Sequence, residues 1–257
     1  MHAIGVEMIL FGMESLLTRA FLQAIVPLQN VELCVLPAFG APHARLVQPA
    51  LRHLITPSSL AETAAMHAIP VLYMTKWEDV APLLTHDTRI VVCCFPRRIP
   101  AWIRQYAHCN IHPSLLPALR GPDPLFYSAR GDAPAGVTLH RMDATFDTGA
   151  ILMQMPVDVS ECRSESSFVR AHALVAATLV CDASLWQRQP MPQATTGVTY
   201  ASLPTGADFV LDVRWSRDRV RQFMQCTDLR QHPYWVPQLQ HWVYTFAEVQ
   251  HLTWELT

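Results

Sequence analysis

The sequence predicts an α/β protein built on a Rossmann-like, mostly parallel sheet. Short and nearly continuous apolar runs alternate with segments whose apolar residues recur at helical spacing, as in strands that are covered on both faces. The 257 residues suffice for one large domain with a small appendage, and 51% of them are hydrophobic, which provides for a sizeable core. No run reaches about 18 uninterrupted apolar residues, so we place no helix in a membrane.

The first half of the chain reads as strands separated by helices. The runs expected to be strands are 3–12, 31–38, 70–74 and 89–95. The segments expected to be helices are 13–26, 58–69 and 76–84, with a long, irregular or partly helical connection over 39–57. Function in such folds sits at the carboxyl ends of the strands. We therefore expect chemistry just after Phe95 and around Asn110.

The second half predicts an irregular hairpin, a long helix and a C-terminal appendage. The hairpin joins strands 137–142 and 151–159 through the loop 143–150, whose tip is a candidate functional element. The segments that follow are a helix over 166–186, a polar proline-rich linker over 187–206, a strand-like piece running into an amphipathic helix over 209–226, and an aromatic tail suited to one or two strands. We expect a main domain over 1–206 and a small subdomain over 207–257.

Composition excludes several classes of function. The net charge of −2 argues against broad nucleic-acid binding. The seven cysteines lie largely in apolar runs without a CxxC pair, so neither a zinc knuckle nor a disulfide framework is supported. Reduced cysteines and an N-terminus without a basic signal region indicate a cytoplasmic protein. Glycine-rich dinucleotide loops, GxSxG and HExxH are also missing.

The segment "CNIHPSLLPALRG" (109–121) places two polar side chains at the end of an apolar strand. In an extended chain, Asn110 and His112 project from the same side. The amide can donate to a developing oxyanion, and the imidazole can move a proton near neutral pH. The alternative is that Asn110 ends a strand and His112 is a turn residue satisfied by the backbone.

A carboxylate in the hairpin loop is the third candidate. Asp147 stands in "FDTGA" beside Phe146, and Gly149 permits an unusual backbone angle. A carboxylate in an apolar setting has a raised pKa or needs a cationic partner such as protonated His112. A turn or cap role is the alternative, and Asp143 in the same loop is an equal candidate from the residues alone.

Together these segments resemble the formyltransferases that use 10-formyltetrahydrofolate. The resemblance rests on "NIHPSLLPALRG", on "GDAPAGVTLHRMDATFDTGAIL" and on their spacing. It implies a Rossmann-like formyltransferase domain with a catalytic trio of Asn110, His112 and Asp147, and it favours the aspartate of D-T-G over Asp143. It also implies that the folate lies against "FPRRIP" (95–100) and the 143–147 loop, mainly through backbone groups. The residues expected to bind the folate are Phe95, Arg97, Arg98, Ile99, Asp143 and Thr145.

The resemblance implies formyl transfer to a primary amine, with 10-formyltetrahydrofolate as co-substrate and no metal. We expect a small acceptor, an amino-sugar nucleotide or an amino-acid derivative, because the basic insertion and full C-terminal barrel of tRNA-specific members are not evident. A homodimer is possible. The alternatives are a methionyl-tRNA formyltransferase-like enzyme, a 10-formyltetrahydrofolate hydrolase and a non-catalytic folate-binding protein. The hydrolases of this type carry an N-terminal regulatory domain, and we expect none before residue 3.

Overall fold

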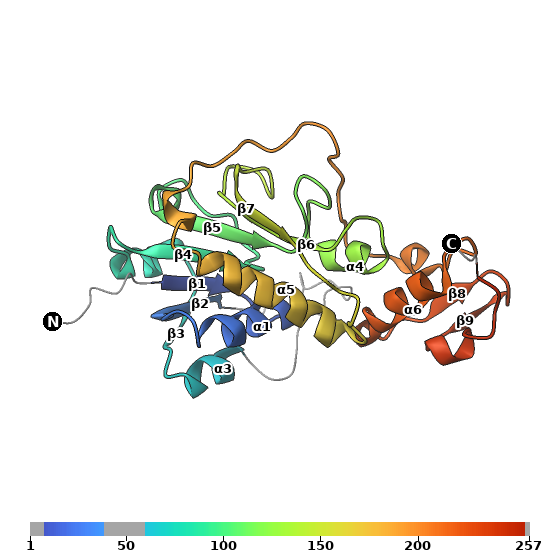
Figure 1. Ribbon diagram of the computed structural model, residues 1–257. Coiled ribbons are helices and arrows are strands. Elements are labelled where there is room, and N and C mark those ends of the chain that lie inside the picture. The colour runs from blue at the N-terminus through green and yellow to red at the C-terminus, as the bar shows by residue number, and fades with distance from the viewer. Residues whose placement is uncertain (1–7, 39–59, 255–257) are drawn as a thin grey trace.

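A computed structural model describes residues 8–38 and 60–254, which form a seven-stranded sheet flanked by helices (Figure 1). The strands of this sheet are β1 (Met8–Gly12), β2 (Leu33–Pro37), β3 (Val71–Met74), β4 (Arg89–Cys93), β5 (Ala107–His112), β6 (Gly136–His140) and β7 (Ile151–Pro156). The helices are α1 (Leu16–Ile25), α3 (Leu60–Met66), α4 (Pro124–Ala129), α5 (Glu165–Val180) and α6 (Arg217–Gln225). A separate two-stranded sheet contains β8 (Tyr234–Val236) and β9 (His241–Val243).

The large sheet has the order β3-β2-β1-β4-β5-β6-β7. The five strands from β3 to β5 are parallel, whereas β6 and β7 are antiparallel to their neighbours. The strand order reverses between β1 and β4, and ligands of such sheets bind beyond the carboxyl ends near that point. The predicted fold class, a mostly parallel Rossmann-like sheet, is confirmed.

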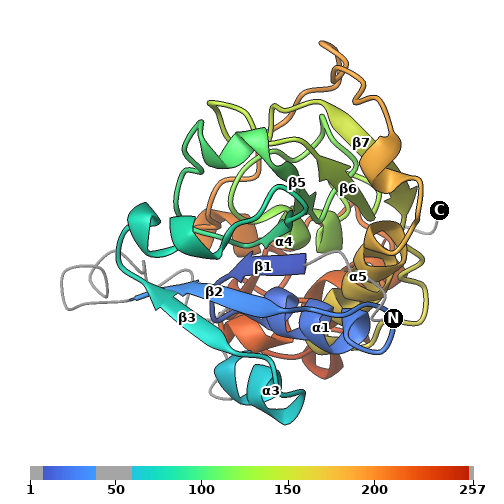
Figure 2. The same cartoon turned by 90° about the vertical axis from the view of Figure 1, so that its left-hand side faces the viewer.

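Alternate residues of the central strands pack on opposite faces of the sheet. Leu10 and Val91 belong to the larger apolar core, and Phe11 and Val92 belong to a second, smaller one. Helices α1 and α5 pack against each other and cover the larger core on one side of the sheet (Figure 2). Burial on both faces explains why these strands read as continuous apolar runs instead of alternating ones.

Several expected elements differ from the structure for identifiable reasons. The helix expected over 76–84 is two short 3₁₀ turns, Trp77–Asp79 and Ala81–Leu83, because Pro82 lacks the N–H that a continuous helix needs. Helix α4 was not expected: it is a short helix whose N-cap is Asp123, with proline at its first position. The start of the strand expected over 3–12 and the connection over 39–57 lie outside the described residues.

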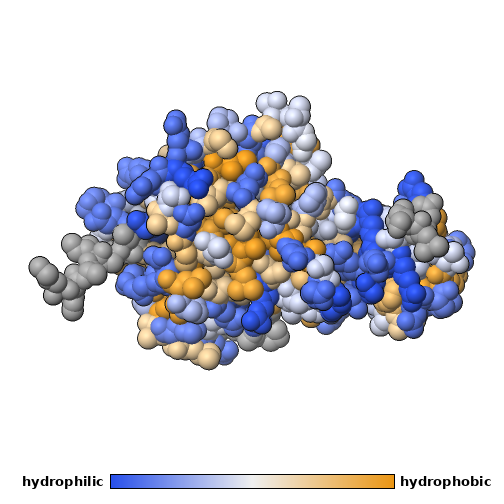
Figure 3. Space-filling view, viewed as in Figure 1, coloured by the Kyte–Doolittle hydropathy of each residue, from blue (hydrophilic) through white to orange (hydrophobic). Residues whose placement is uncertain are grey.

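The C-terminal segment packs onto the rest of the chain through aromatic side chains. Its piece over 209–213, expected to be strand-like, contributes a single bridge from Val210 to Trp235. Tyr234 is buried and belongs to the larger core, and Trp235 meets Trp242 across β8 and β9 at 5.4 Å between ring centroids. Aromatic side chains therefore attach this segment to the rest of the chain, and the face of this part that is seen in Figure 3 is largely hydrophilic. No helix within the described ranges is both long and apolar enough to cross a bilayer.

Three charged residues are buried where α4, α5 and the C-terminal segment meet. Asp123 and Arg230 form a paired contact at 2.6 and 3.0 Å, and Glu165 Oε1 lies 3.4 Å from Arg230 Nε. Burial raises the pKa of Glu165 to about 7, with Arg230 opposing the rise and Asp123 adding to it. Glu165 is therefore only partly ionised near neutral pH.

We expect Glu165→Gln to stabilise the protein at pH 8 but not at pH 5. The folded-state pKa of Glu165 lies above its ordinary value of 4.5, so the folded state is penalised when this carboxyl ionises. The free energy of unfolding therefore falls as the pH rises from about 4.5 to about 7 and beyond, by about 3 kcal/mol in total. Glutamine keeps an acceptor for Arg230 and does not ionise. Urea unfolding at the two pH values measures the difference, and an equal effect at both would contradict it.

Candidate active site

Strand β5 ends at the carboxyl edge of the sheet and presents Asn110 and His112 there, as the i, i+2 spacing predicts. Its antiparallel pairing with β6 sets His140 directly opposite Asn110. Asn110 Nδ2 lies 3.0 Å from His140 Nε2. His140 Nδ1 lies 2.8 Å from the carbonyl oxygen of Arg141, which can only accept. In the neutral ring, His140 Nδ1 therefore carries the proton, and Nε2 accepts from the Asn110 amide.

His112 is only 3% exposed, and both of its ring nitrogens have partners. Nε2 donates to the carbonyl oxygen of Leu119 at 2.8 Å, and Nδ1 lies 3.4 Å from Asp147 Oδ1. Burial lowers the pKa of His112 below its ordinary value of 6.5, although the Asp147 carboxylate opposes the shift. The ring is therefore neutral at neutral pH, in contrast to the protonated state considered from the sequence.

Asp147 reaches this ring from the loop between β6 and β7. Its Oδ2 accepts the N–H of Gly121 at 3.0 Å, and its Oδ1 also lies 3.7 Å from His140 Nε2. Burial would raise the pKa of the Asp147 carboxyl, but His140, His112 and the Gly121 N–H outweigh it, and the pKa lies below its ordinary value. Near pH 7 the site thus holds an ionised carboxylate against a neutral imidazole.

The loop differs from expectation in which residue adopts the unusual backbone angle. Asp147 itself has a φ of 57°, in the left-handed region, which aspartate tolerates better than most residues. Glycine is needed at position 149 for a different reason: the backbone there passes close to Arg141, and a Cβ would lie 1.7 Å from the carbonyl oxygen of Arg141. The Phe146 side chain is 58% exposed, and the Arg98 guanidinium lies 5.7 Å from the centre of its ring.

The structure also distinguishes Asp143 from Asp147, which were equal candidates from the sequence. Asp143 is exposed, and its carboxylate accepts from the Thr145 backbone N–H at 2.9 Å and from the Thr148 hydroxyl at 2.8 Å. It stabilises the loop in the way the turn interpretation describes. Asp147, in contrast, faces His112. Thr145 is exposed beside Asp143.

The other residues expected to bind folate have distinct environments. The Phe95 side chain is buried against Phe11 and Trp77, so only its backbone can face a ligand. Arg97 Nη1 donates to the Thr75 carbonyl oxygen at 2.8 Å and so ties the ends of β3 and β4 together. Arg98 is exposed above Phe146, and Ile99 packs partly against the smaller core.

Two residues near the trio were missed from the sequence. His140 lies within the strand expected over 137–142, and only its pairing position opposite Asn110 indicates that it reaches the site. Gln193 lies in the linker after α5, yet its amide contacts the Asp147 loop at 2.8 Å. In the ranges that the structure describes, no three histidine, cysteine, aspartate or glutamate side chains gather as a metal site would require.

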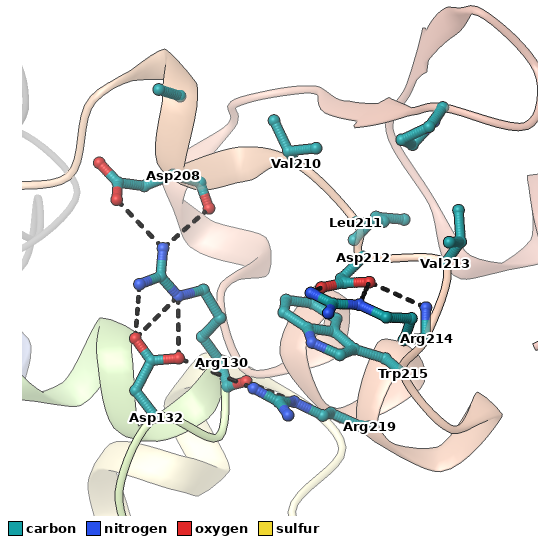
Figure 4. Close-up of a pocket in the computed structure, with 12 residues that line it drawn as sticks. Arg130, Asp132, Asp208, Val210, Leu211, Asp212, Val213, Arg214, Trp215 and Arg219 are labelled. Carbon is teal, nitrogen blue, oxygen red and sulfur yellow. Dashed lines mark hydrogen bonds and ion pairs between the residues drawn. The ribbon is translucent and has the colours of Figure 1, made fainter. Parts of the chain in front are cut away.

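A separate cavity of about 650 Å³ lies between the end of α4 and the C-terminal segment (Figure 4). Its lining includes no member of the trio. Arg130 contacts Asp132 and Asp208, and Arg214 contacts Asp212 at 2.6 Å. These ion pairs compensate most of the charge that lines the cavity.

Residues 79–181 match the model of the family described as formyl transferase. A methionyl-tRNA formyltransferase of Dichelobacter nodosus is 27% identical over 171 residues, which cover 63% of this chain and 54% of the relative. A GDP-perosamine N-formyltransferase of Brucella melitensis is 36% identical over 123 residues, which cover 45% of this chain and 46% of the relative. The chain thus spans about half the length of these curated relatives.

The fold is shared with a sugar N-formyltransferase from Shewanella sp. FDAARGOS_354. The two structures superpose with a TM-score of 0.58 at 19% sequence identity, over 98% of this chain and 99% of the other. The matched family segment contains β4 to β7 and therefore Asn110, His112, His140 and Asp147. The resemblance to formyltransferases that was read from the sequence is confirmed.

Proposed function

We propose that this protein transfers the formyl group of 10-formyltetrahydrofolate to a primary amine of a small acceptor, with a nucleotide-linked amino sugar as the first candidate. The observation that carries the proposal is the meeting of His112 and Asp147, 35 positions apart in the chain, beside the amide of Asn110. The similarity to a GDP-perosamine N-formyltransferase and the fold shared with a sugar N-formyltransferase support the acceptor class.

The proposed reaction begins when a neutral amine attacks the formyl carbon, so that a new C–N bond forms and the formyl oxygen gains negative charge. The Asn110 amide has a second N–H besides the one directed at His140, and it donates to this oxygen. The bond from the formyl carbon to N10 then breaks. The proton lost by the attacking nitrogen ends on N10 of the tetrahydrofolate.

His112 and Asp147 are suited to move that proton. A neutral imidazole beside an ionised carboxylate can accept one proton, and the resulting imidazolium is stabilised by Asp147 at 3.4 Å. The pair then returns the proton to the leaving nitrogen. No metal and no covalent enzyme intermediate enters this scheme.

The folate is proposed to bind where the segment 95–100 faces the loop 143–147, which Arg98 and Phe146 connect by their cation–π contact. Because the Phe95 side chain is buried, recognition there falls to backbone groups and to Ile99. The homodimer and the cytoplasmic location expected from the sequence remain predictions.

The test incubates the purified protein with 10-formyltetrahydrofolate and a panel of amines. The panel contains GDP-perosamine, other nucleotide-linked amino sugars, amino-acid derivatives and methionyl-tRNA. We expect tetrahydrofolate release that depends on an amino sugar, with a formyl mass gain on that sugar. Transfer to methionyl-tRNA alone would replace the acceptor, amine-independent release would indicate a hydrolase, and folate binding without turnover would indicate a binding protein.

A further inference from the structure

The linker after α5 crosses the site as a strap, which we define as residues 190–201. Near one end, Met191 and Ile151 exchange backbone hydrogen bonds of 2.7 and 2.8 Å at the start of β7. Near the other end, Arg120 N–H donates to Thr199 O at 2.9 Å, and Ala201 N–H donates to Arg120 O at 2.6 Å. The strap therefore connects the loop that follows β5 to the hairpin that carries Asp147.

Gln193 is the strap residue that contacts both of these loops through its side chain. Its Nε2 donates to the carbonyl oxygens of Asp147 and Gly149, both at 2.8 Å. Its Oε1 accepts from Arg120 Nε at 3.1 Å and from Arg120 Nη2 at 2.6 Å. Because a carbonyl only accepts and a guanidinium only donates, these partners fix which end of the amide is nitrogen.

These contacts bear directly on the orientation of the Asp147 carboxylate. The residue holds a left-handed φ of 57°, a conformation that is unfavourable for a non-glycine residue and needs support from its surroundings. Gln193 supports the peptide on the carboxyl side of Asp147. The same Arg120 that binds Gln193 precedes Gly121, whose N–H holds Asp147 Oδ2. The carboxylate is thus held from both sides.

We propose that Gln193 is a positioning residue that holds Asp147 against His112. The inference rests on the proposed function for its kinetic consequence, but the geometry that it describes can be measured without turnover. Displacement of a reacting group by about 1 Å can lower a reaction rate on the order of 10²-fold, and this sets the upper size of the kcat effect that we expect.

The test compares Gln193→Leu and Gln193→Glu with Thr195→Ala, an exposed position of the same strap. Leucine removes every hydrogen bond at similar size. Glutamate keeps an acceptor for Arg120 but sets oxygen against the Asp147 and Gly149 carbonyls. We expect both Gln193 variants to lose about 10- to 100-fold in kcat with KM for the folate little changed, and Thr195→Ala to match the wild type.

The glutamate variant separates positioning from simple attachment of the strap. If Gln193 served only to anchor the strap to Arg120, Gln193→Glu would retain wild-type kcat, and that result would overturn the proposal. A fall in kcat matched by an equal loss of folate affinity and of thermal stability would also overturn it, because general unfolding would then explain both.

Titration of His112 by NMR gives a readout that is independent of activity. The Asp147 carboxylate raises the pKa of His112 against the effect of burial. If Asp147 moves away in Gln193→Leu, the pKa of His112 falls further below its wild-type value, whereas Thr195→Ala leaves it unchanged. An unchanged His112 titration in Gln193→Leu would refute the positioning role, even if the wild-type protein proved to lack formyl transfer.

Discussion

Replacing His112 with asparagine is expected to lower formyl transfer by at least about 10²–10³-fold while folate binding is largely retained. Asparagine places its amide near the position of the imidazole Nδ1, so it does not reach the Leu119 carbonyl that Nε2 binds, and this one hydrogen bond is lost. The titratable imidazole beside Asp147 is also lost, and it is the group that we propose exchanges the proton. Single-turnover rates and equilibrium binding of a folate analogue measure the two effects separately.

His108→Asn provides the matched control for this variant. His108 lies on the same strand, is 5% exposed where His112 is 3% exposed, and also bonds a backbone carbonyl, that of Tyr106 at 2.9 Å. It stands near the opposite end of β5, away from Asp147. We expect His108→Asn to leave kcat near that of the wild type. If the two variants lost turnover and folate binding to the same degree, His112 would have a structural role instead.

The strands, and the edge of the sheet at which Asn110 and His112 lie, could be predicted because their signals are local. Continuous apolar runs such as 89–95 report burial on both faces of a sheet, and the i, i+2 spacing of Asn110 and His112 reports a shared side. Proline after His112 marks the end of the strand. These properties depend on neighbouring residues, so the sequence alone contains them.

The arrangement around Asp147 could not be read in the same way, because it depends on partners far along the chain. Whether Asp143 or Asp147 meets His112 follows from the path of the loop over Arg141, which Gly149 permits by its close approach. The charge state of His112 follows from burial, which no local pattern reports. Gln193 lies in a segment without regular structure, and only the strap's pairing brings it to the site.

Replacing Arg230 with methionine is expected to destabilise the protein by about 3–5 kcal/mol, the largest effect on stability that we predict. Arg230 and Asp123 are both almost fully buried and make two hydrogen bonds at 2.6 and 3.0 Å. Methionine fills much of the same volume beside Phe126, but it leaves the Asp123 carboxylate without its paired cation. Urea unfolding at pH 7 measures the loss.

Arg221→Met is the control in the same C-terminal segment, since Arg221 pairs with Asp218 at 2.9 Å where both side chains are exposed to solvent. An exposed pair of this kind contributes about 1 kcal/mol or less, so Arg221→Met should unfold close to the wild type. Equal destabilisation by the two substitutions would show that loss of a long side chain, and not loss of the buried ion pair with Asp123, dominates at Arg230.

The source of the Arg230 effect can be isolated by adding Asp123→Asn. Asparagine is a good N-cap, so it can still accept the Phe126 N–H at the start of α4, but it removes the buried charge. We therefore expect the Arg230→Met substitution to cost clearly less in the Asp123→Asn background than alone.

Asp123 follows Gly121 by two residues, and the Gly121 N–H holds Asp147 Oδ2. If the ion pair also steadies the site, Arg230→Met lowers kcat at temperatures where the protein is still folded, and the Asp123→Asn background restores part of it. If the two substitutions instead lowered the free energy of unfolding additively, the effect of Arg230→Met would not arise from its pairing with Asp123.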